Sequence, residues 1–104
     1  KFHREDGPAI EYVDGGKAWY INGFLHREDG PAVEYLNGHK AWYINGLRHR
    51  EDGPAVEYFD GNKEWFISGI VINEQVEEWM LINDIGQYED WTNKEIAMFK
   101  LKFL

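Results

Sequence analysis

The chain has 104 residues, of which 43% are hydrophobic and 16% aromatic, so it is long enough for one small folded domain and too apolar for a disordered segment. Its net charge of -8 disfavours binding to nucleic acid or to anionic lipid, because both carry negative phosphates. The absence of cysteine excludes disulfides, thiolate zinc sites and a cysteine nucleophile. The sequence contains neither a membrane-spanning apolar stretch nor a signal peptide, so we expect a cytoplasmic protein.

A 23-residue repeat accounts for residues 1–69, divided as 1–23, 24–46 and 47–69. Its most distinctive segment, His-Arg-Glu-Asp-Gly-Pro-Ala, starts at His3, His26 and His49. Each copy ends in an aromatic segment, which is Trp-Tyr-Ile-Asn-Gly in the first two repeats and Trp-Phe-Ile-Ser-Gly in the third. The chain begins almost at the first motif and without a methionine, so we expect either a piece of a longer protein or an artificially shortened chain.

Within each repeat the pattern predicts antiparallel strands joined by tight turns. In the second repeat, residues 32–35 alternate between two faces and predict one strand. A turn at Asn37-Gly38 leads to a partner strand at 39–44, and Asn45-Gly46 predicts a second turn, because asparagine and glycine tolerate positive φ. The Glu-Asp-Gly-Pro segment predicts a third corner, since proline donates no hydrogen bond to a sheet.

The 39–44 strand has aromatic residues on both faces. Trp42 and Ile44 share one face, and Ala41 and Tyr43 share the other. If the tryptophan face is buried, the other face displays one aromatic ring per repeat and is a candidate docking surface for a protein partner. The rings of this ladder are Tyr20, Tyr43 and Phe66. The alternative is that a thin sheet divides its aromatic residues between both faces.

The pattern Trp-x-x-Asn-Gly-x-x-His on a 23-residue period resembles a variant form of the MORN repeat, over residues 1–69. It differs in carrying Arg-Glu-Asp-Gly-Pro after the histidine, where Gly-x-Gly is usual. The resemblance implies a single-layer, twisted meander of hairpins that serves protein association and, in some members, lipid contact. Chains with this motif resemble products of bacteriophages, bacteria and large viruses, which implies a phage-type inhibitor that occupies a basic surface of a host defence protein in the host cytoplasm.

Residues 70–104 predict a helical C-terminal cap. Asn73 is the expected N-cap of a first helix, whose apolar stripe ends where Asp84-Ile85-Gly86 breaks the pattern. Thr92 and Glu95 have the spacing of a capping box and predict a second helix, although 99–103 also alternates like a strand. The helix residues expected to share an inward face are Val76, Trp79, Met80 and Asn83 in the first helix and Ile96, Phe99 and Phe103 in the second.

These patterns together predict a mainly β protein with a C-terminal α segment. Its architecture is a single-layer antiparallel β-hairpin meander capped by one or two helices. A single sheet cannot bury its apolar face alone, so we expect Trp79 and Phe99 to cover the end of the third repeat.

The repeated motif also has the residue types of an active site, with histidine as a general base and arginine as an anion clamp. Three similar copies along a ribbon favour a structural role instead, in which aspartate hydrogen-bonds its own turn and arginine pairs with a nearby carboxylate. The residues of this interpretation are Asp6, Asp29 and Asp52, Arg4, Arg27 and Arg50, and Glu11, Glu34 and Glu57. We expect no cofactor and no metal site, since His26, Glu28 and Asp29 are too close along one turn to converge and His39 occurs once.

The expected function is therefore a non-enzymatic protein–protein interaction module. Besides the aromatic ladder, the acidic tail is expected to contact a protein partner, such as a nucleic-acid-binding host protein, or a second copy in a homodimer. The acidic candidates are Glu74, Glu77, Glu78, Asp84, Glu89 and Asp90. The alternatives are a small hydrolase or ligand-binding protein that uses one His/Arg/Asp cluster, and a self-assembling structural scaffold.

Overall fold

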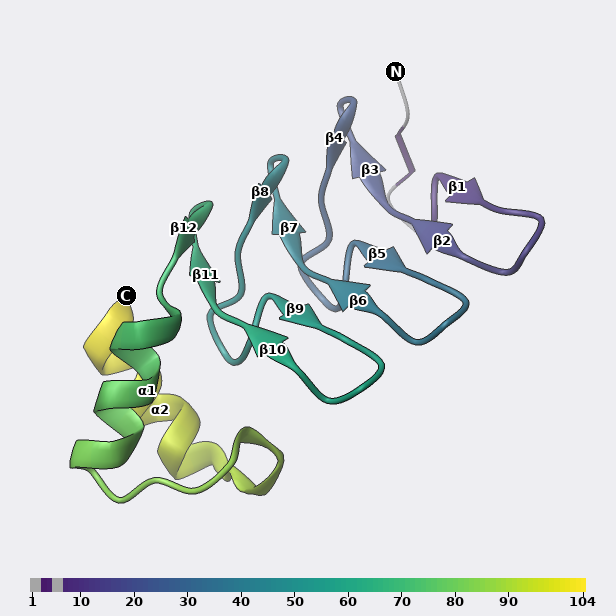
Figure 1. Ribbon diagram of the computed structural model, residues 1–104. Helices are drawn as coiled ribbons and strands as arrows, with labels where there is room; N and C mark the ends of the chain where they lie inside the picture. The colour runs from purple at the N-terminus through teal and green to yellow at the C-terminus, as the bar shows by residue number, and fades with distance from the viewer. Residues whose placement is uncertain (1–2, 5–6) are drawn as a thin grey trace.

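The repeats form two rows of short hairpins, and two helices close one end of the molecule (Figure 1). The computed structural model describes residues 3–4 and 7–104, which extend over 44 × 26 × 22 Å. The strands of these residues are β1 (Ile10–Glu11), β2 (Lys17–Ala18), β3 (Tyr20–Ile21), β4 (Phe24–Leu25), β5 (Val33–Glu34), β6 (Lys40–Ala41), β7 (Tyr43–Ile44), β8 (Leu47–Arg48), β9 (Val56–Glu57), β10 (Lys63–Glu64), β11 (Phe66–Ile67) and β12 (Ile70–Val71). This arrangement confirms the predicted meander of antiparallel hairpins.

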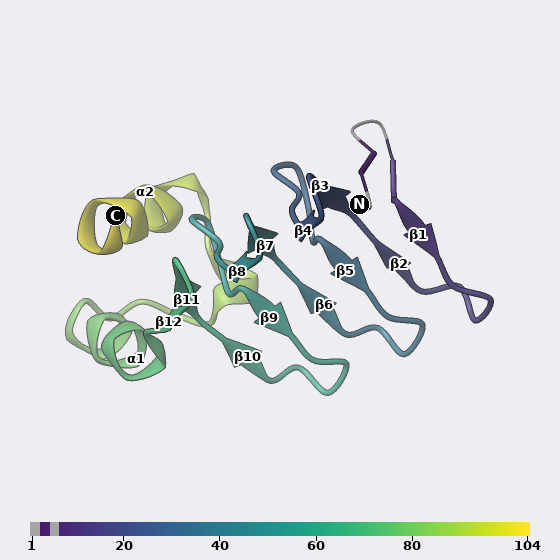
Figure 2. The same cartoon turned by 90° about the horizontal axis from the view of Figure 1, so that it is seen from above.

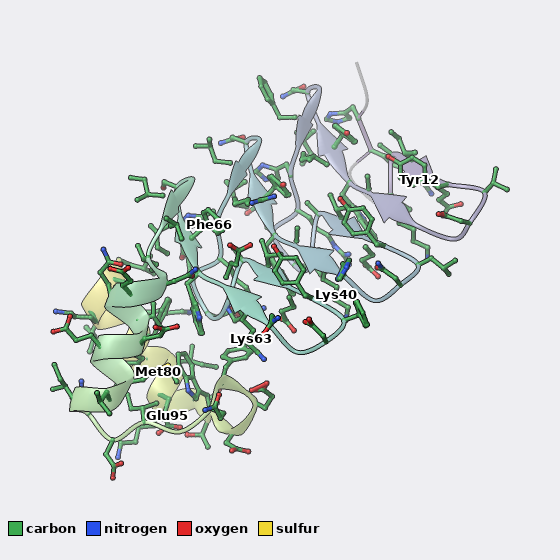
Figure 3. The ribbon with its side chains drawn as sticks, viewed as in Figure 1. Tyr12, Lys40, Lys63, Phe66, Met80 and Glu95 are labelled. Atoms are coloured by element: carbon green, nitrogen blue, oxygen red, sulfur yellow. The ribbon has the colours of Figure 1, made fainter. Side chains whose placement is uncertain are left out.

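The first hairpin of each repeat joins a continuous antiparallel sheet in the order β1-β2-β5-β6-β9-β10. Because directly paired residues share a face, the register places a row of mostly small apolar residues on one side. This row is Ile10, Ala18, Val33, Ala41, Val56 and Glu64. The row on the other side alternates in charge from strand to strand as Glu11, Lys17, Glu34, Lys40, Glu57 and Lys63, of which Figure 3 labels two lysines. The register thus sets opposite charges side by side on this face, although the ion pairs of Glu34 and Glu57 are formed with Arg27 and Arg50.

The second hairpin of each repeat leaves this sheet and stands at an angle to it, as Figure 2 shows from above. These hairpins pair β3 with β4, β7 with β8 and β11 with β12. Their turns need positive φ at both central positions, which Asn45 (φ 51°) and Gly46 (φ 81°) adopt readily. The third hairpin has Ser68 (φ 50°) at the asparagine position and continues to Val71, past the predicted repeat boundary at 69.

The strand predicted at 39–44 is two strands, β6 and β7, interrupted at Trp42. The backbone N–H of Trp42 donates to the Ala55 carbonyl, and its own carbonyl accepts from His49 N–H. Trp42 thus bonds to the motif loop of the third repeat on both sides, which turns the chain out of the sheet. The predicted faces are nevertheless correct, because Tyr43 packs on the apolar row with Ala41 while Trp42 faces the opposite side.

The C-terminal cap consists of α1 (Asn73–Ile82), a short 3-10 helix η1 (Tyr88–Asp90) and α2 (Asn93–Phe103). Val76, Trp79 and Phe99 are buried against Trp65 of the third repeat, as expected for a lid on the open end of the sheet. Of the other expected inward residues, Met80 and Phe103 pack on this cluster, Ile96 is half-buried, and Asn83 is exposed beyond the end of α1.

The structure confirms the predicted start of the second helix and corrects the predicted start of the first. The capping box of Thr92 and Glu95 is present, and 99–103 is helix rather than strand. The predicted N-cap role of Asn73 is wrong, because the N-cap position is Ile72 and the Asn73 side chain accepts a hydrogen bond from Trp65 N–H instead. Asn73 therefore ties the cap to the third repeat.

No helix of residues 3–4 and 7–104 has the length and apolar character needed to cross a membrane.

Candidate functional site

The His-Arg-Glu-Asp loops are inserted between successive repeats. The backbone N–H of His26 donates to the Trp19 carbonyl in the repeat before it, and that of Arg27 donates to the Tyr43 carbonyl in the second hairpin of its own repeat. The next copy repeats the pattern, with His49 N–H bonded to Trp42 and Arg50 N–H to Phe66. The motif is thus the joint between repeats.

The histidine side chains reinforce this joint with both ring nitrogens. His26 Nδ1 accepts from the backbone N–H of Asn45 at 3.0 Å, and His49 Nδ1 accepts from that of Ser68 at 2.8 Å. Because Nδ1 accepts, the ring proton lies on Nε2, which faces Glu28 in the second repeat at 3.3 Å and Glu51 in the third at 2.9 Å. Neither ring has a nitrogen left over to act as a general base.

The arginine side chains are equally occupied. Arg27 stacks over the ring of Trp19 at 3.9 Å and donates to Asp29 at 2.9 Å and Glu34 at 3.1 Å. Arg50 does the same in the third repeat, over Trp42 at 3.8 Å and to Asp52 and Glu57. The predicted pairing of arginine with glutamate is confirmed in these two repeats.

The aspartate of the motif binds the arginine rather than its own turn. The Arg27 guanidinium hydrogen-bonded to Asp29 lowers the pKa of that carboxyl below its ordinary value of 3.8. In the first repeat, Arg4 Nη1 donates to the Pro8 carbonyl at 3.4 Å. Asp6 lies outside the described residues.

The largest groove lies between the second and third motif loops, on the outer side of the repeats, and has a volume of about 770 Å³. Its lining includes His26, Arg27, Trp42, Ile44, His49 and Arg50. The histidines and arginines of this outer groove are held by the contacts described above, so the groups at its rim are exposed carboxylates such as Glu28. Among residues 3–4 and 7–104 no group of three or more histidine, aspartate or glutamate side chains is placed to hold a metal ion.

A second groove of about 340 Å³ lies on the inner side, where the first hairpins of repeats one and two meet the second hairpin of repeat one. Its walls are aromatic and apolar, and Asp14 is the acid among them. We call this the inner groove, lined by Tyr12, Asp14, Gly16, Ala18, Tyr20, Leu25, Val33, Tyr35 and Leu36. Tyr12, labelled in Figure 3, is 51% exposed and Tyr35 is 56% exposed.

The predicted aromatic ladder lies on this inner side. Tyr20 lines the inner groove, while Tyr43 and Phe66 pack against the buried row of Val33, Ala41 and Val56. All three rings are half-buried. The structure therefore brings them onto one side of the molecule, and places only part of each ring in contact with solvent.

The predicted acidic residues lie on different parts of the cap and are exposed. Three are on α1, one follows α1, and two are on η1: Glu74, Glu77 and Glu78, then Asp84, then Glu89 and Asp90. Glu89 forms an ion pair with Lys63 of the third repeat, and this contact lowers the pKa of the Glu89 carboxyl. Glu89 thus helps to hold the cap on the sheet.

Two rows of large exposed apolar side chains were missed in the sequence analysis. They follow the hairpin tips, where one residue of each repeat points outward. The first tip row is Val13, Leu36 and Phe59, and the second tip row is Phe24, Leu47 and Ile70. The available signal was an apolar residue recurring every 23 residues within or beside a Gly-containing turn, a position where polar residues are usual.

No protein-family model, curated protein or solved structure matches this chain. The resemblance to MORN repeats therefore stays a prediction that rests on the residues of the repeat. Whatever function is assigned to the chain has to come from the geometry of its own surfaces.

Proposed function

We propose that this chain is a non-enzymatic protein-interaction module, whose partner docks on the hairpin tips and the inner groove. The observation that carries this proposal is the pair of tip rows. Leu36 and Phe59 are each 70% exposed, and Leu47 is 50% exposed, in rows that follow the repeat axis. Exposed apolar surface of this kind, repeated along one direction, is typical of protein-binding sites.

The state of the motif loops supports a non-enzymatic role. General acid–base catalysis needs a histidine or carboxyl that can reach a substrate proton. In the second and third repeats, the histidine and arginine of the motif are hydrogen-bonded to backbone, carboxylate or both. A hydrolase would need at least one of these groups to give up its role in joining repeats.

The charge of the chain supports a partner with a basic surface. At -8 the molecule attracts positively charged proteins at long range, and exposed carboxylates are spread over the outer groove and the cap. A phage-type inhibitor that covers the basic surface of a nucleic-acid-binding host protein would use this combination of acidic and apolar surface.

Capture from an extract of the source or host cells, compared among variants, tests the proposal. Leu36→Ser with Phe59→Ser removes two members of the first tip row. Leu81→Ser with Leu101→Ser is the matched control, because those leucines are 83% and 86% exposed on the helices. We expect a protein captured by the wild type to be lost with the tip-row variant and kept with the control, at similar urea midpoints.

Sedimentation of the purified chain distinguishes the remaining outcomes. A dimer that the tip-row variant abolishes would identify a second copy as the partner. The proposal is wrong if wild type and both variants retain the same proteins and all sediment as monomers.

A further inference from the structure

The place between the second and third repeats that corresponds to the inner groove, which we call the counterpart groove, carries Arg48, whose exposed side chain contacts aromatic rings. The guanidinium Nε donates to the Tyr43 hydroxyl at 3.1 Å, and the guanidinium carbon lies 5.3 Å from the centre of the Phe66 ring. Tyr58 and Glu64 lie close enough to favour its positive charge, and together with the Tyr43 hydrogen bond they raise the pKa of Arg48. This position therefore shows what such a groove holds: an arginine side chain among aromatic rings.

His39 occupies the rest of the same space. Its ring lies edge-on to Tyr58 at 5.3 Å and tilted against Phe59 at 5.2 Å. Its Nδ1 accepts from the backbone N–H of Phe59 at 2.9 Å, which fixes the ring in place. The exposed Arg48 and the half-buried His39 are thus the side chains that contact the aromatic rings of the counterpart groove.

The inner groove has neither of these two side chains. One repeat earlier, Leu25 stands at the position of Arg48, and Gly16 stands at the position of His39. The pairing of Leu25 with Tyr20 is the same as that of Arg48 with Tyr43, so the local frame is conserved between the two grooves. Tyr20 and Tyr35 stand at the positions of Tyr43 and Tyr58, while Leu36 replaces Phe59, and these residues line an open groove.

The inner groove carries its negative charge at a different position from its counterpart, where Glu64 lies near Arg48. Asp14 stands where the second repeat has Asn37. One oxygen of its carboxylate accepts from Gly16 N–H at 3.0 Å, as the Asn37 amide does from His39 N–H at 3.1 Å, which holds the acid in the groove wall. Aromatic ring faces beside a fixed carboxylate attract a cation, and a planar guanidinium can stack on the rings and hydrogen-bond at once.

We propose that the inner groove binds an arginine side chain of the partner protein, in the way that the counterpart groove holds Arg48. The inference rests on the proposed function and adds the chemistry of the partner's anchoring residue. It also agrees with a net charge of -8, which favours an arginine-bearing surface over an acidic one.

A titration followed by two-dimensional NMR tests the inference with a blocked pentapeptide, glycine except for a central arginine. The control peptide carries citrulline, which keeps the planar shape and loses the charge. We expect saturable shifts of the Tyr12, Gly16 and Tyr35 amides with the arginine peptide, and at least about threefold weaker binding of the citrulline peptide. Equal binding of both peptides, or no shift at these amides, would overturn the inference.

A variant that fills the groove provides an independent check. Leu25→Arg places a guanidinium opposite the Tyr20 hydroxyl and should abolish the shifts. Tyr35→Ala, which removes one half-exposed wall, should weaken binding as well, so the test survives if the first variant folds poorly. Binding left unchanged in a folded Leu25→Arg variant would contradict the proposed position.

Variants of two aspartates at equivalent turns distinguish binding in the inner groove from general attraction of the peptide to an acidic protein. Asp14 and Asp60 each accept from the backbone N–H two residues later, and an asparagine keeps that turn. We expect Asp14→Asn to weaken the peptide about three- to tenfold and Asp60→Asn to leave it nearly unchanged. Equal weakening by both variants would show non-specific charge attraction and overturn the inference. If the wild-type chain does not bind the arginine peptide, but captures a partner that the tip-row variant does not capture, this inference is rejected and the proposed function is kept.

Discussion

The side chain of the motif histidine accepts a hydrogen bond from a backbone N–H. In each described contact its Nδ1 accepts from a backbone N–H in the turn that closes the same repeat: Asn22 for His3, Asn45 for His26 and Ser68 for His49. The accepting nitrogen and the turn it holds recur every 23 residues, which explains why the sequence repeats a residue that is usually read as catalytic. Side-chain recognition of a neighbouring backbone is a means of fixing the spacing of repeats.

Replacing His26 or His49 by alanine is therefore predicted to lower the free energy of unfolding by a similar amount. His26→Ala and His49→Ala each remove the side-chain acceptor of one exposed backbone N–H, a loss of about 0.5–1.5 kcal/mol in the free energy of unfolding. Urea unfolding followed by tryptophan fluorescence measures it. A catalytic role would instead show as complete loss of an activity from a single copy, with unfolding unchanged.

The elements of this protein are short, and their ends are bonded individually. Every strand of the described chain is two residues long, so the sheet depends on its turns and on the ion pairs that join Glu34 and Glu57 to the motif arginines. In the cap, α2 begins at a capping box in which Thr92 accepts from Lys94 N–H and donates to Glu95. The start of α1 lacks a side-chain cap, since Asn73 bonds to the sheet.

The capping box gives a prediction about pH. Hydrogen bonds from the side chain and backbone of Thr92 lower the pKa of Glu95 below its ordinary value of 4.5. Because the folded pKa is the lower one, this contribution to stability is present above the unfolded pKa and is lost as the pH falls through the folded pKa. Glu95→Gln still accepts the backbone hydrogen bond and does not ionise, so it should lose less stability on acidification.

Urea unfolding of wild type and Glu95→Gln at about pH 7 and about pH 3 measures the difference, which should be a smaller drop for the variant. Asp29 and Glu89 also have lowered pKa values, so part of the acid-induced loss remains. An identical drop in both proteins would show that the capping box does not stabilise the folded state.

At the scale of the whole molecule, each repeat contacts its neighbours and the cap replaces a fourth repeat. Trp19 is covered by Arg27 and Trp42 by Arg50, both from the repeat that follows. Trp65 has no following repeat and is covered instead by Tyr88, Trp91 and Phe99 of the cap. The Tyr88 hydroxyl also accepts from Arg50, so the cap contacts the motif loop of the third repeat as well as Trp65.

We predict that Phe99→Ala loosens one end of the molecule before the other. Phe99 is 0% exposed, and truncating a buried phenylalanine typically costs about 3–5 kcal/mol. In a stack of repeats with nearest-neighbour contacts, hydrogen exchange should lose protection mainly in the cap and third repeat, with less change around Ala18 and Val33. A uniform loss of protection over all amides would show that the chain unfolds as one cooperative unit.

The sequence by itself determined the antiparallel hairpins, their turns and the two helices. It could do so because these depend on local chemistry: positive φ at Asn-Gly, the missing N–H of proline, and the Thr92–Glu95 spacing. The pairing of arginine with glutamate was also predictable, since both residues recur at the same interval.

The tertiary structure decided what depends on contacts between repeats. The break at Trp42, the role of Asn73 and the histidine–backbone bonds each join residues that share no local pattern. The inner groove is the clearest case. Gly16 and Leu25 line it, whereas one repeat later the equivalent positions carry the larger polar side chains of His39 and Arg48. Local propensity specifies each turn and helix, whereas an open or filled groove depends on which side chains the stacking of repeats brings together.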